Sequence, residues 1–223
     1  MPEERILINL KNKNNLSIIR ATSTIELEKN YLPVRIPLLK GILGYRIFLI
    51  HSKNQDKFAT IRSIDELKKM TVGQGRGRSD VELLIKNGFN VVVGDEYETL
   101  FKILIAGRFD YFSRGINEAF DEYLHRKNLY PDLLVEKTIC IQYPFAEYFF
   151  FNKDDLRLAS RVEAGLKIMI KDGSFDQIFD KYYKDIIIKA DLSKRKIFKI
   201  NNPLLPSETP LNIKEYWINP AFY

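Results

Sequence analysis

The amino-acid sequence predicts an α/β fold built on mixed, mainly parallel sheets. Short β-rich runs alternate with helical segments through the middle of the chain, which is the order that parallel strands joined by helices require. Helix start and stop signals recur along the same region. Apolar residues make up 45% of the 223 residues and charged residues 29%, a balance typical of globular proteins.

The β-rich and helical segments can be placed in order along the chain. The expected strands lie at 47–50, 70–73, 89–93, 109–112, 138–143 and 148–151. The expected helices lie at 64–69, 80–87, 96–106, 117–126, 155–171 and 175–184. The chain after about residue 187 is basic and then rich in proline, so we expect an extended arm with a short helix near 213–217.

Capping patterns indicate where several of these helices begin and end. A serine followed three residues later by Glu or Gln occurs at 23–26, 63–66, 79–82 and 174–177. Such a serine caps the free N–H groups of a first helical turn. Gly88 and Gly107 follow helical segments and are expected to end them, because glycine readily adopts the left-handed backbone of a helix C-terminus.

Charge and composition exclude several functional classes. The net charge is +6, but lysines are mixed with acidic residues and the longest basic block is Lys194-Arg195-Lys196, so no nucleic-acid partner is expected. One cysteine excludes an intrachain disulfide, and with only two histidines no zinc site is expected, nor any other metal or cofactor. No apolar run approaches the roughly 20 residues of a membrane span.

The residues predict a protein that is not an enzyme. No G-x-S-x-G motif occurs, and neither His51 nor His125 is attached to a cysteine or serine motif, so no nucleophile–base pair is expected. The aromatic residues of 143–151 are expected to build core rather than to line a cleft. The first ten residues lack the basic start and long apolar core of a secretory signal, which predicts a cytoplasmic location if this start is genuine.

The most informative stretch is Gly73–Asp80, which follows an expected strand and opens an expected helix. Its glycines let the backbone approach a ligand, and the free N–H groups of a first helical turn bind anions. The glycine spacing fits neither the dinucleotide fingerprint nor the phosphate loop. The alternative is a tight turn with two solvated arginines. The residues expected to form an anion or carboxylate site are Arg76, Gly77, Arg78, Ser79 and Asp80, with Ser79 as the helix cap.

A second strand–helix junction lies at 107–118 and carries Arg114, Asn117 and Glu118. Ligands in open α/β sheets bind beyond the carboxyl ends of the strands. We therefore expect Arg114 and Asn117 to face the same site as the Gly73–Asp80 stretch. The alternative is that Arg114 pairs with a nearby carboxylate on the surface.

The order of these segments resembles the type 2 periplasmic solute-binding proteins of family 3, the amino-acid-type substrate-binding proteins of ABC transporters. The resemblance spans about residues 5 to 185. It is carried by the segments 16–29, 44–50, 63–82, 106–110, 162–166 and 172–182. Two further strings, 33–41 and 202–211, resemble a bacterial branch of transporter-type binding proteins.

This resemblance implies a two-lobed protein that closes on a ligand. The first lobe would comprise residues 1–46 and 145–223 and would lack its first strand and helix, and the second would comprise 47–144. The implied function is non-enzymatic capture of a small polar, anionic solute in the cleft between the lobes, for delivery to a membrane permease in the periplasm. A ligand-sensing module with a sensor partner, a dehydratase-like enzyme and a truncated relic that binds nothing are the alternatives.

The resemblance also implies roles for particular residues. Thr22 matches a first-lobe hydroxyl that meets the ligand, and the stretch 78–80 matches the second-lobe loop that grips its carboxylate. Leu27 stands where the family has an arginine that binds the carboxylate, and Gly115 where it has an aspartate that takes the ligand's amino group. These two departures favour an anionic ligand over an amino acid.

Overall fold

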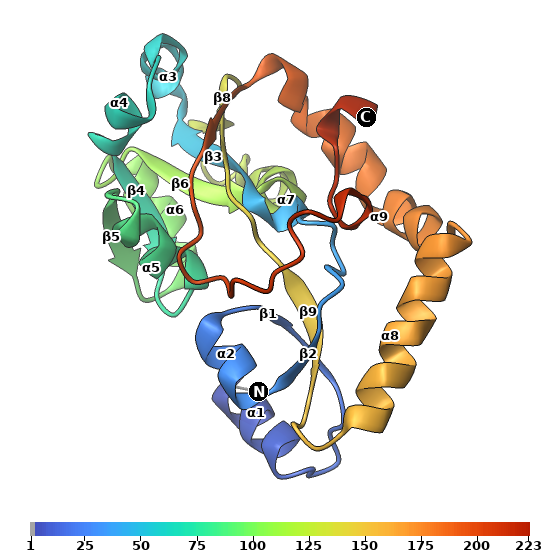
Figure 1. Ribbon diagram of the computed structural model, residues 1–223. Helices are drawn as coiled ribbons and strands as arrows, with labels where there is room; N and C mark the ends of the chain where they lie inside the picture. Colours follow the sequence, from blue (N-terminus) through green and yellow to red (C-terminus); the bar gives the residue numbers. More distant parts are fainter. Residues whose placement is uncertain (1–2) are drawn as a thin grey trace. The chain divides into compact units, whose positions relative to one another are not determined.

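The computed structural model describes residues 3–223, and the chain divides into two compact units, most of whose helices and strands are labelled in Figure 1. Unit 1 comprises Met1–Gly41, Pro144–Lys184 and Leu204–Ile218, and unit 2 comprises Ile42–Tyr143, Asp185–Pro203 and Asn219–Tyr223. The expected lobes were 1–46 with 145–223 and 47–144, whereas unit 2 of this division begins at Ile42 and also includes Asp185–Pro203 and Asn219–Tyr223.

The elements alternate as the sequence predicts, and the mixed α/β class is confirmed. The helices are α1 (Glu3–Lys11), α2 (Ile25–Asn30), α3 (Gln55–Thr60), α4 (Ile64–Lys68), α5 (Ser79–Lys86), α6 (Tyr97–Ile105), α7 (Ile116–Arg126), α8 (Leu156–Lys171) and α9 (Ser174–Ala190). The strands are β1 (Ile19–Thr22), β2 (Leu32–Val34), β3 (Tyr45–His51), β4 (Thr71–Gly75), β5 (Asn90–Gly94), β6 (Tyr111–Gly115), β7 (Leu133–Val135), β8 (Ile139–Gln142), β9 (Glu147–Phe151) and β10 (Lys196–Lys199).

Unit 2 is built on one mixed sheet with the strand order β10-β8-β3-β6-β4-β5, and β7 pairs with β3 beside this path. Strand β4 runs parallel to both β5 and β6, and β10 runs parallel to β8. Strand β3 runs antiparallel to β6, β7 and β8. Parallel pairing is thus concentrated where strands alternate with α5 and α6, the region whose alternation predicted it.

The core of unit 2 surrounds β3, whose residues Ile47–Ile50 are fully buried on both faces of the strand. Such a continuous apolar run is typical of a strand covered on both sides. Helix α6 contributes buried Leu100, Phe101 and Leu104. Gly73 in β4 is a packing requirement, because the ring of Phe109 lies where a side chain at residue 73 would have to go.

Unit 1 contains a three-stranded antiparallel sheet with the order β1-β9-β2, a reduced sheet that fits the expected incomplete lobe. The two faces of β9 enter different clusters. Tyr148 and Phe150 pack with Leu10 and Tyr31, whereas Phe151 packs with buried residues of α8 and α9. The aromatic residues of this region therefore build core, as expected.

Helix boundaries agree with the capping signals at some positions and differ at others. Ser63 accepts a hydrogen bond from the Glu66 N–H and caps α4, as expected. Gly88 and Gly107 have positive φ after α5 and α6, also as expected. Ser79 does not cap α5: Arg78 is the N-cap residue, and Ser79 is the first helical residue. Thr24, rather than Ser23, caps α2.

The tail is more regular than the expected extended arm. Helix α9 continues to Ala190, and Lys196–Lys199 then forms β10, which hydrogen-bonds to β8 at the edge of the unit 2 sheet. This pairing is why Asp185–Pro203 belongs to unit 2. The short helix expected near 213–217 is a single 3₁₀ turn at Lys214–Tyr216.

Candidate functional site

The candidate site lies in unit 2, at the carboxyl ends of β4 and β6. These two strands are parallel hydrogen-bonded neighbours, and each leads into a helix, α5 after β4 and α7 after β6. Neighbouring parallel strands end at the same edge of a sheet, so the starts of α5 and α7 share that edge. Seven of the eight sequence-predicted site residues lie at these two junctions; Thr22 lies in unit 1.

The loop between β4 and α5 presents unpaired backbone donors. The N–H groups of Gly77, Ser79 and Asp80 donate no hydrogen bond to any described residue. Gly77 has a φ of +75°, the left-handed conformation that turns the chain into the helix. Arg78 is exposed and forms no ion pair with a described residue. Free N–H groups at a helix start and an unpaired guanidinium are suited to a carboxylate or another anion.

Arg76, unlike Arg78, already has a carboxylate partner. Its guanidinium pairs with Asp95, and the two side chains are 70% and 72% exposed. This arrangement matches the alternative of a solvated arginine in a turn. The expectation that Arg76 helps to grip an anion is therefore not supported by its surroundings.

Asp80 takes part in a buried ion pair rather than facing solvent. Its carboxylate pairs with Arg46 of β3, and both side chains are nearly fully buried. The Gln74 side-chain amide donates to the same carboxylate oxygen at 3.1 Å, and the Arg46 Nε donates to the Tyr143 hydroxyl at 2.7 Å. Asp80 thus fixes the start of α5 against β3.

Arg114 is also buried and paired, with its side chain only 4% exposed. Its Nη2 lies 2.6 Å from Glu122 Oε1 and 3.2 Å from Glu118 Oε2, and its Nε donates to Glu122 Oε2 at 2.8 Å. Arg114 therefore pairs with carboxylates, which was the alternative interpretation, although the pair is buried rather than on the surface.

Glu118 connects the two arginines at the start of α7. Its Oε2 lies 3.5 Å from Arg46 Nη1 and 3.2 Å from Arg114 Nη2, and it accepts the Gly115 N–H at 3.2 Å. Burial alone would raise the pKa of the Glu118 carboxyl, but Arg114 and Arg46 outweigh it and hold the pKa below its usual range. Glu118 is therefore ionised at neutral pH.

The cluster as a whole does not carry an excess of positive charge. Two guanidiniums, Arg46 and Arg114, face three carboxylates, Asp80, Glu118 and Glu122. The side chain of Glu118 is 27% exposed and that of Glu122 11%. The α7 end of the site is thus acidic, whereas the α5 end offers free N–H groups and Arg78.

Asn117 adds an acceptor to the α7 end. Its Oδ1 is buried and has no hydrogen-bond partner among the described residues. A Cβ placed on Gly115 would collide with this oxygen and would lie 3.2 Å from Arg46 Nη1 and 3.4 Å from Glu118 Oε2. The space beside Gly115 is therefore bordered by the Asn117 amide and the Glu118 carboxylate.

The unit 1 residues singled out from the sequence have mainly structural partners. Thr22 pairs through its backbone with Glu147 of β9, and Leu27 packs against the cluster that contains Leu10 and Tyr31. The expected role of Thr22 toward a ligand stays a prediction. Nearby, the Ser23 hydroxyl donates to the buried carboxylate of Glu28 at 2.6 Å.

The sequence interpretation missed Arg46, which is central to the cluster. The available signal was a charged residue inside an otherwise apolar β3, because a charge in a fully buried strand requires a buried partner. It also missed Glu122, which follows Glu118 by one helical turn and so faces the same side of α7.

Within residues 3–223, no three His, Cys, Asp or Glu side chains are grouped closely enough to hold a metal ion. Among the helices described, none has the length and apolarity needed to cross a membrane.

Comparison with known proteins identifies the fold. No protein-family model matches the chain, and no curated protein matches it by sequence. Among solved structures, it is similar to an ancestral arginine-binding protein bound to arginine, at 19% identity and a TM-score of 0.57, covering 82% of this chain and 78% of that one. An amino-acid ABC transporter substrate-binding protein from Streptococcus pneumoniae, bound to L-arginine, is 15% identical with a TM-score of 0.57, covering 82% and 74%.

A third solved structure is also similar to this chain. It is an ancestral amino acid-binding protein described as a precursor of cyclohexadienyl dehydratase, at 19% identity and a TM-score of 0.53, covering 79% of this chain and 73% of that one. The chain therefore has the fold of the amino-acid substrate-binding proteins of ABC transporters, and the resemblance read from the sequence is confirmed at the level of the fold.

Proposed function

We propose that this chain is a substrate-binding protein that captures a small zwitterionic solute of the amino-acid class at the edge formed by β4 and β6. The observation that carries the proposal is the opposite character of the two helix starts. Free N–H groups and Arg78 lie at α5, and ionised Glu118 with the Asn117 oxygen lies at α7. A zwitterion presents charges of both signs and complements this arrangement.

The carboxylate of the ligand is assigned to the α5 end. The N–H groups of Gly77, Ser79 and Asp80 have no other acceptor among the described residues, and the helix start favours negative charge. Arg78 supplies a charge-assisted hydrogen bond of about 1.5–3 kcal/mol. Asp80 acts as a positioning residue here, because its buried pair with Arg46 holds the helix start in place.

The ammonium group of the ligand is assigned to the α7 end. Glu118 is ionised and partly exposed, and the Asn117 Oδ1 lies beside Gly115 without a partner among the described residues. These groups replace the aspartate that the resemblance placed at position 115. The proposal thus revises the expected purely anionic ligand, since Arg76 and Arg114 are already paired with Asp95 and Glu122.

Binding rather than catalysis is favoured by the ionisation state of the Glu118 carboxylate. A general acid at neutral pH needs a pKa raised toward 7, whereas the pKa of Glu118 is held below its usual range. The solved structures named above include proteins bound to arginine, which supports an amino-acid ligand. Delivery of the ligand to a membrane permease, outside the cytoplasmic membrane, is the role we propose; reporting it to a sensor partner is the alternative.

Titration calorimetry with L-arginine, L-glutamine, their α-keto analogues and glucose tests the proposal. We expect saturable binding of an amino acid, at least ten-fold weaker binding of its α-keto analogue, and no heat with glucose. Arg78→Ala should weaken amino-acid binding ten-fold or more, which corresponds to about 1.4 kcal/mol.

The matched control is Arg76→Ala, which removes the same charge from the same loop but breaks only the exposed pair with Asp95. It should change the affinity less than two-fold. Equal losses in both variants, or an α-keto acid bound as tightly as its amino acid, would contradict the assignment of the two ends.

A further inference from the structure

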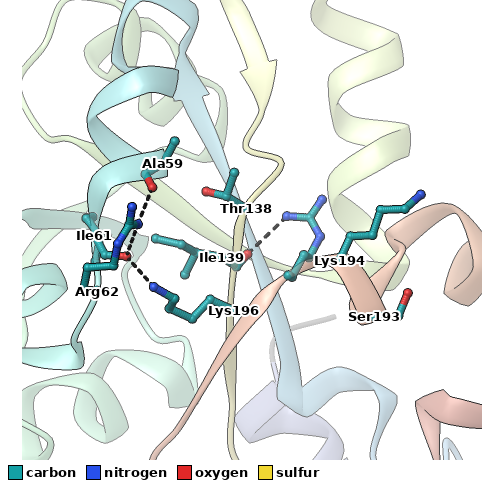
Figure 2. Close-up of a pocket in the computed structure, with 9 residues that line it drawn as sticks. Ala59, Ile61, Arg62, Thr138, Ile139, Ser193, Lys194 and Lys196 are labelled. Atoms are coloured by element: carbon teal, nitrogen blue, oxygen red, sulfur yellow. Dashed lines mark hydrogen bonds between the residues drawn. The ribbon is translucent and has the colours of Figure 1, made fainter.

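A second feature of unit 2 has the chemistry of a ligand site and lies away from the α5 and α7 helix starts. A cavity of about 350 Å³ is lined by the end of α3, the start of β8, the 3₁₀ turn Leu192–Lys194 and the start of β10. Its wall contains four cationic side chains, which are Arg62, Lys194, Arg195 and Lys196. Figure 2 shows these lining residues and their hydrogen bonds.

Two of the four cations are neutralised by carboxylates. Lys194 lies 2.8 Å from Asp191, and Arg195 lies 3.6 Å from buried Glu136. The Arg195 guanidinium also donates hydrogen bonds to backbone carbonyls. Its Nη1 donates to Glu136 O at 2.6 Å and to Ile139 O at 3.1 Å. These two side chains are therefore committed to the structure of the cavity wall.

The other two cations have only neutral partners. Arg62 Nη1 donates to Ala59 O at 2.7 Å and to Ile61 O at 3.4 Å, and Lys196 Nζ donates to the same Ile61 O at 3.1 Å. Neither forms an ion pair with a carboxylate in residues 3–223. Figure 2 shows Lys196 of β10 reaching the Ile61 carbonyl, beside which Arg62, the next residue in the chain, also lies. Two like charges that share one neutral acceptor repel each other, and an anion bound between them would be attracted by both.

The acidic group facing this pair is Glu66 of α4. Its Oε2 accepts the Arg62 backbone N–H at 2.8 Å, and this hydrogen bond is the main reason that the pKa of Glu66 lies below its usual range. Glu66 is exposed, and its charge is attracted to Lys196 at longer range without forming a direct ion pair. It therefore leaves both cationic heads without a direct carboxylate partner.

We propose that this cavity is a second binding site, for a small multivalent oxyanion of the phosphate class held between Arg62 and Lys196. A phosphate group offers several acceptor oxygens, so it can accept from the guanidinium and from the ammonium at the same time. A volume of about 350 Å³ accommodates such a group together with a small attached body. The site is independent of the amino-acid site, and β10 from the tail forms one of its walls.

Calorimetry with inorganic pyrophosphate at constant ionic strength, adjusted with sodium chloride, tests the proposal. We expect saturable binding with one site per chain. Lys196→Gln and Arg62→Gln should each weaken it ten-fold or more, whereas Lys196→Arg, which keeps the charge, should weaken it less than three-fold. A loss of affinity in Lys196→Gln that Lys196→Arg restores cannot come from misfolding alone.

The matched control is Lys199→Gln, which removes the same charge from the exposed end of the same strand but lies outside the cavity. It should leave the affinity within two-fold of the original chain, as should Arg78→Ala. Absence of saturable binding up to 10 mM, or an equal loss in Lys199→Gln, would overturn the proposal. Preference for a poly-glutamate peptide over pyrophosphate would also overturn it, in favour of a protein partner.

Discussion

The amide oxygen of Asn117 lies in the space that a side chain on Gly115 would fill. Gly115 has a φ of −60° and a ψ of 146°, which any residue can adopt, so the glycine is required by packing and not by backbone conformation. The absence of a side chain at residue 115 is what leaves room for the Asn117 amide oxygen and the Glu118 carboxylate beside this residue, at the start of α7.

We therefore expect Gly115→Ala to destabilise the protein by about 1–3 kcal/mol, the usual cost of inserting a methyl group into a filled site. Urea unfolding measures this change. The penalty should fall by more than half in an Asn117→Ala background, which removes the colliding oxygen. Gly165→Ala is the opposite case: Gly165 lies within α8 with open space around its Cα, so the change should stabilise by up to ~1 kcal/mol. Equal effects of the two substitutions would contradict the packing explanation.

The buried pair of Arg46 and Asp80 should be sensitive to the loss of one partner. Asp80→Ala leaves a buried guanidinium with reduced compensation, and we expect a loss of about 3–5 kcal/mol in the free energy of unfolding. Replacing both partners, as in Arg46→Met with Asp80→Leu, should recover a large part of it. Asp95→Ala breaks the exposed pair with Arg76 and should cost less than about 1 kcal/mol. A double variant as unstable as Asp80→Ala alone would show that unpaired charge is not the cause.

Acid should destabilise the protein partly through Glu118. The folded-state pKa of this group lies below its unfolded value of 4.5, so its contribution is fully present above about pH 4.5 and is lost as the pH falls through the folded-state pKa. Glu118→Gln should therefore flatten the acid side of a plot of unfolding free energy against pH. Glu82→Gln, on the exposed face of α5, is the control. An unchanged acid slope in Glu118→Gln would rule out the proposed contribution of this group.

Cys140 should report global unfolding. It lies in β8 and is fully buried, and burial raises the pKa of its thiol to about 12. Because the thiolate is the reactive form, a chromogenic disulfide reagent at pH 8 should react with the folded chain more than ten-fold slower than with the chain in denaturing urea. The chain has one cysteine, so Cys140→Ala gives the background. Rapid labelling without denaturant would show that β8 opens locally.

The alternation of strands and helices could be predicted from the sequence because each element carries its own local signal. Helices α4, α6 and α8 lie within one or two residues of their expected ranges. The N-cap of α5 lies one residue before the expected Ser79, because the cap position falls on Arg78, whose side chain makes no capping hydrogen bond and so gives no local signal. Strand β10 was missed because a short basic segment at a sheet edge is defined by its partner β8 and not by its own pattern.

The sequence could predict that the two junctions of the candidate site share a sheet edge, but it could not predict which of their charged side chains have internal partners. The Gly73–Asp80 and 107–118 junctions do lie at one sheet edge, which follows from the order of strands. Which arginines are already neutralised depends on contacts between residues far apart in sequence, such as Arg46 with Asp80. A linear pattern holds no information on such pairings, so Arg114 and Arg76 were assigned to a ligand although they have internal partners.

The order of strands in the two sheets also constrains how the chain assembles as it is synthesised. In unit 1, β9 lies between β1 and β2, so these two strands have no neighbour in their sheet until residues 147–151 have emerged. Strands β3 to β8 of unit 2 are drawn from one continuous segment and can pair as they emerge. We therefore expect most of the second sheet to form before the first, with β10 closing its edge only after α9 has been made.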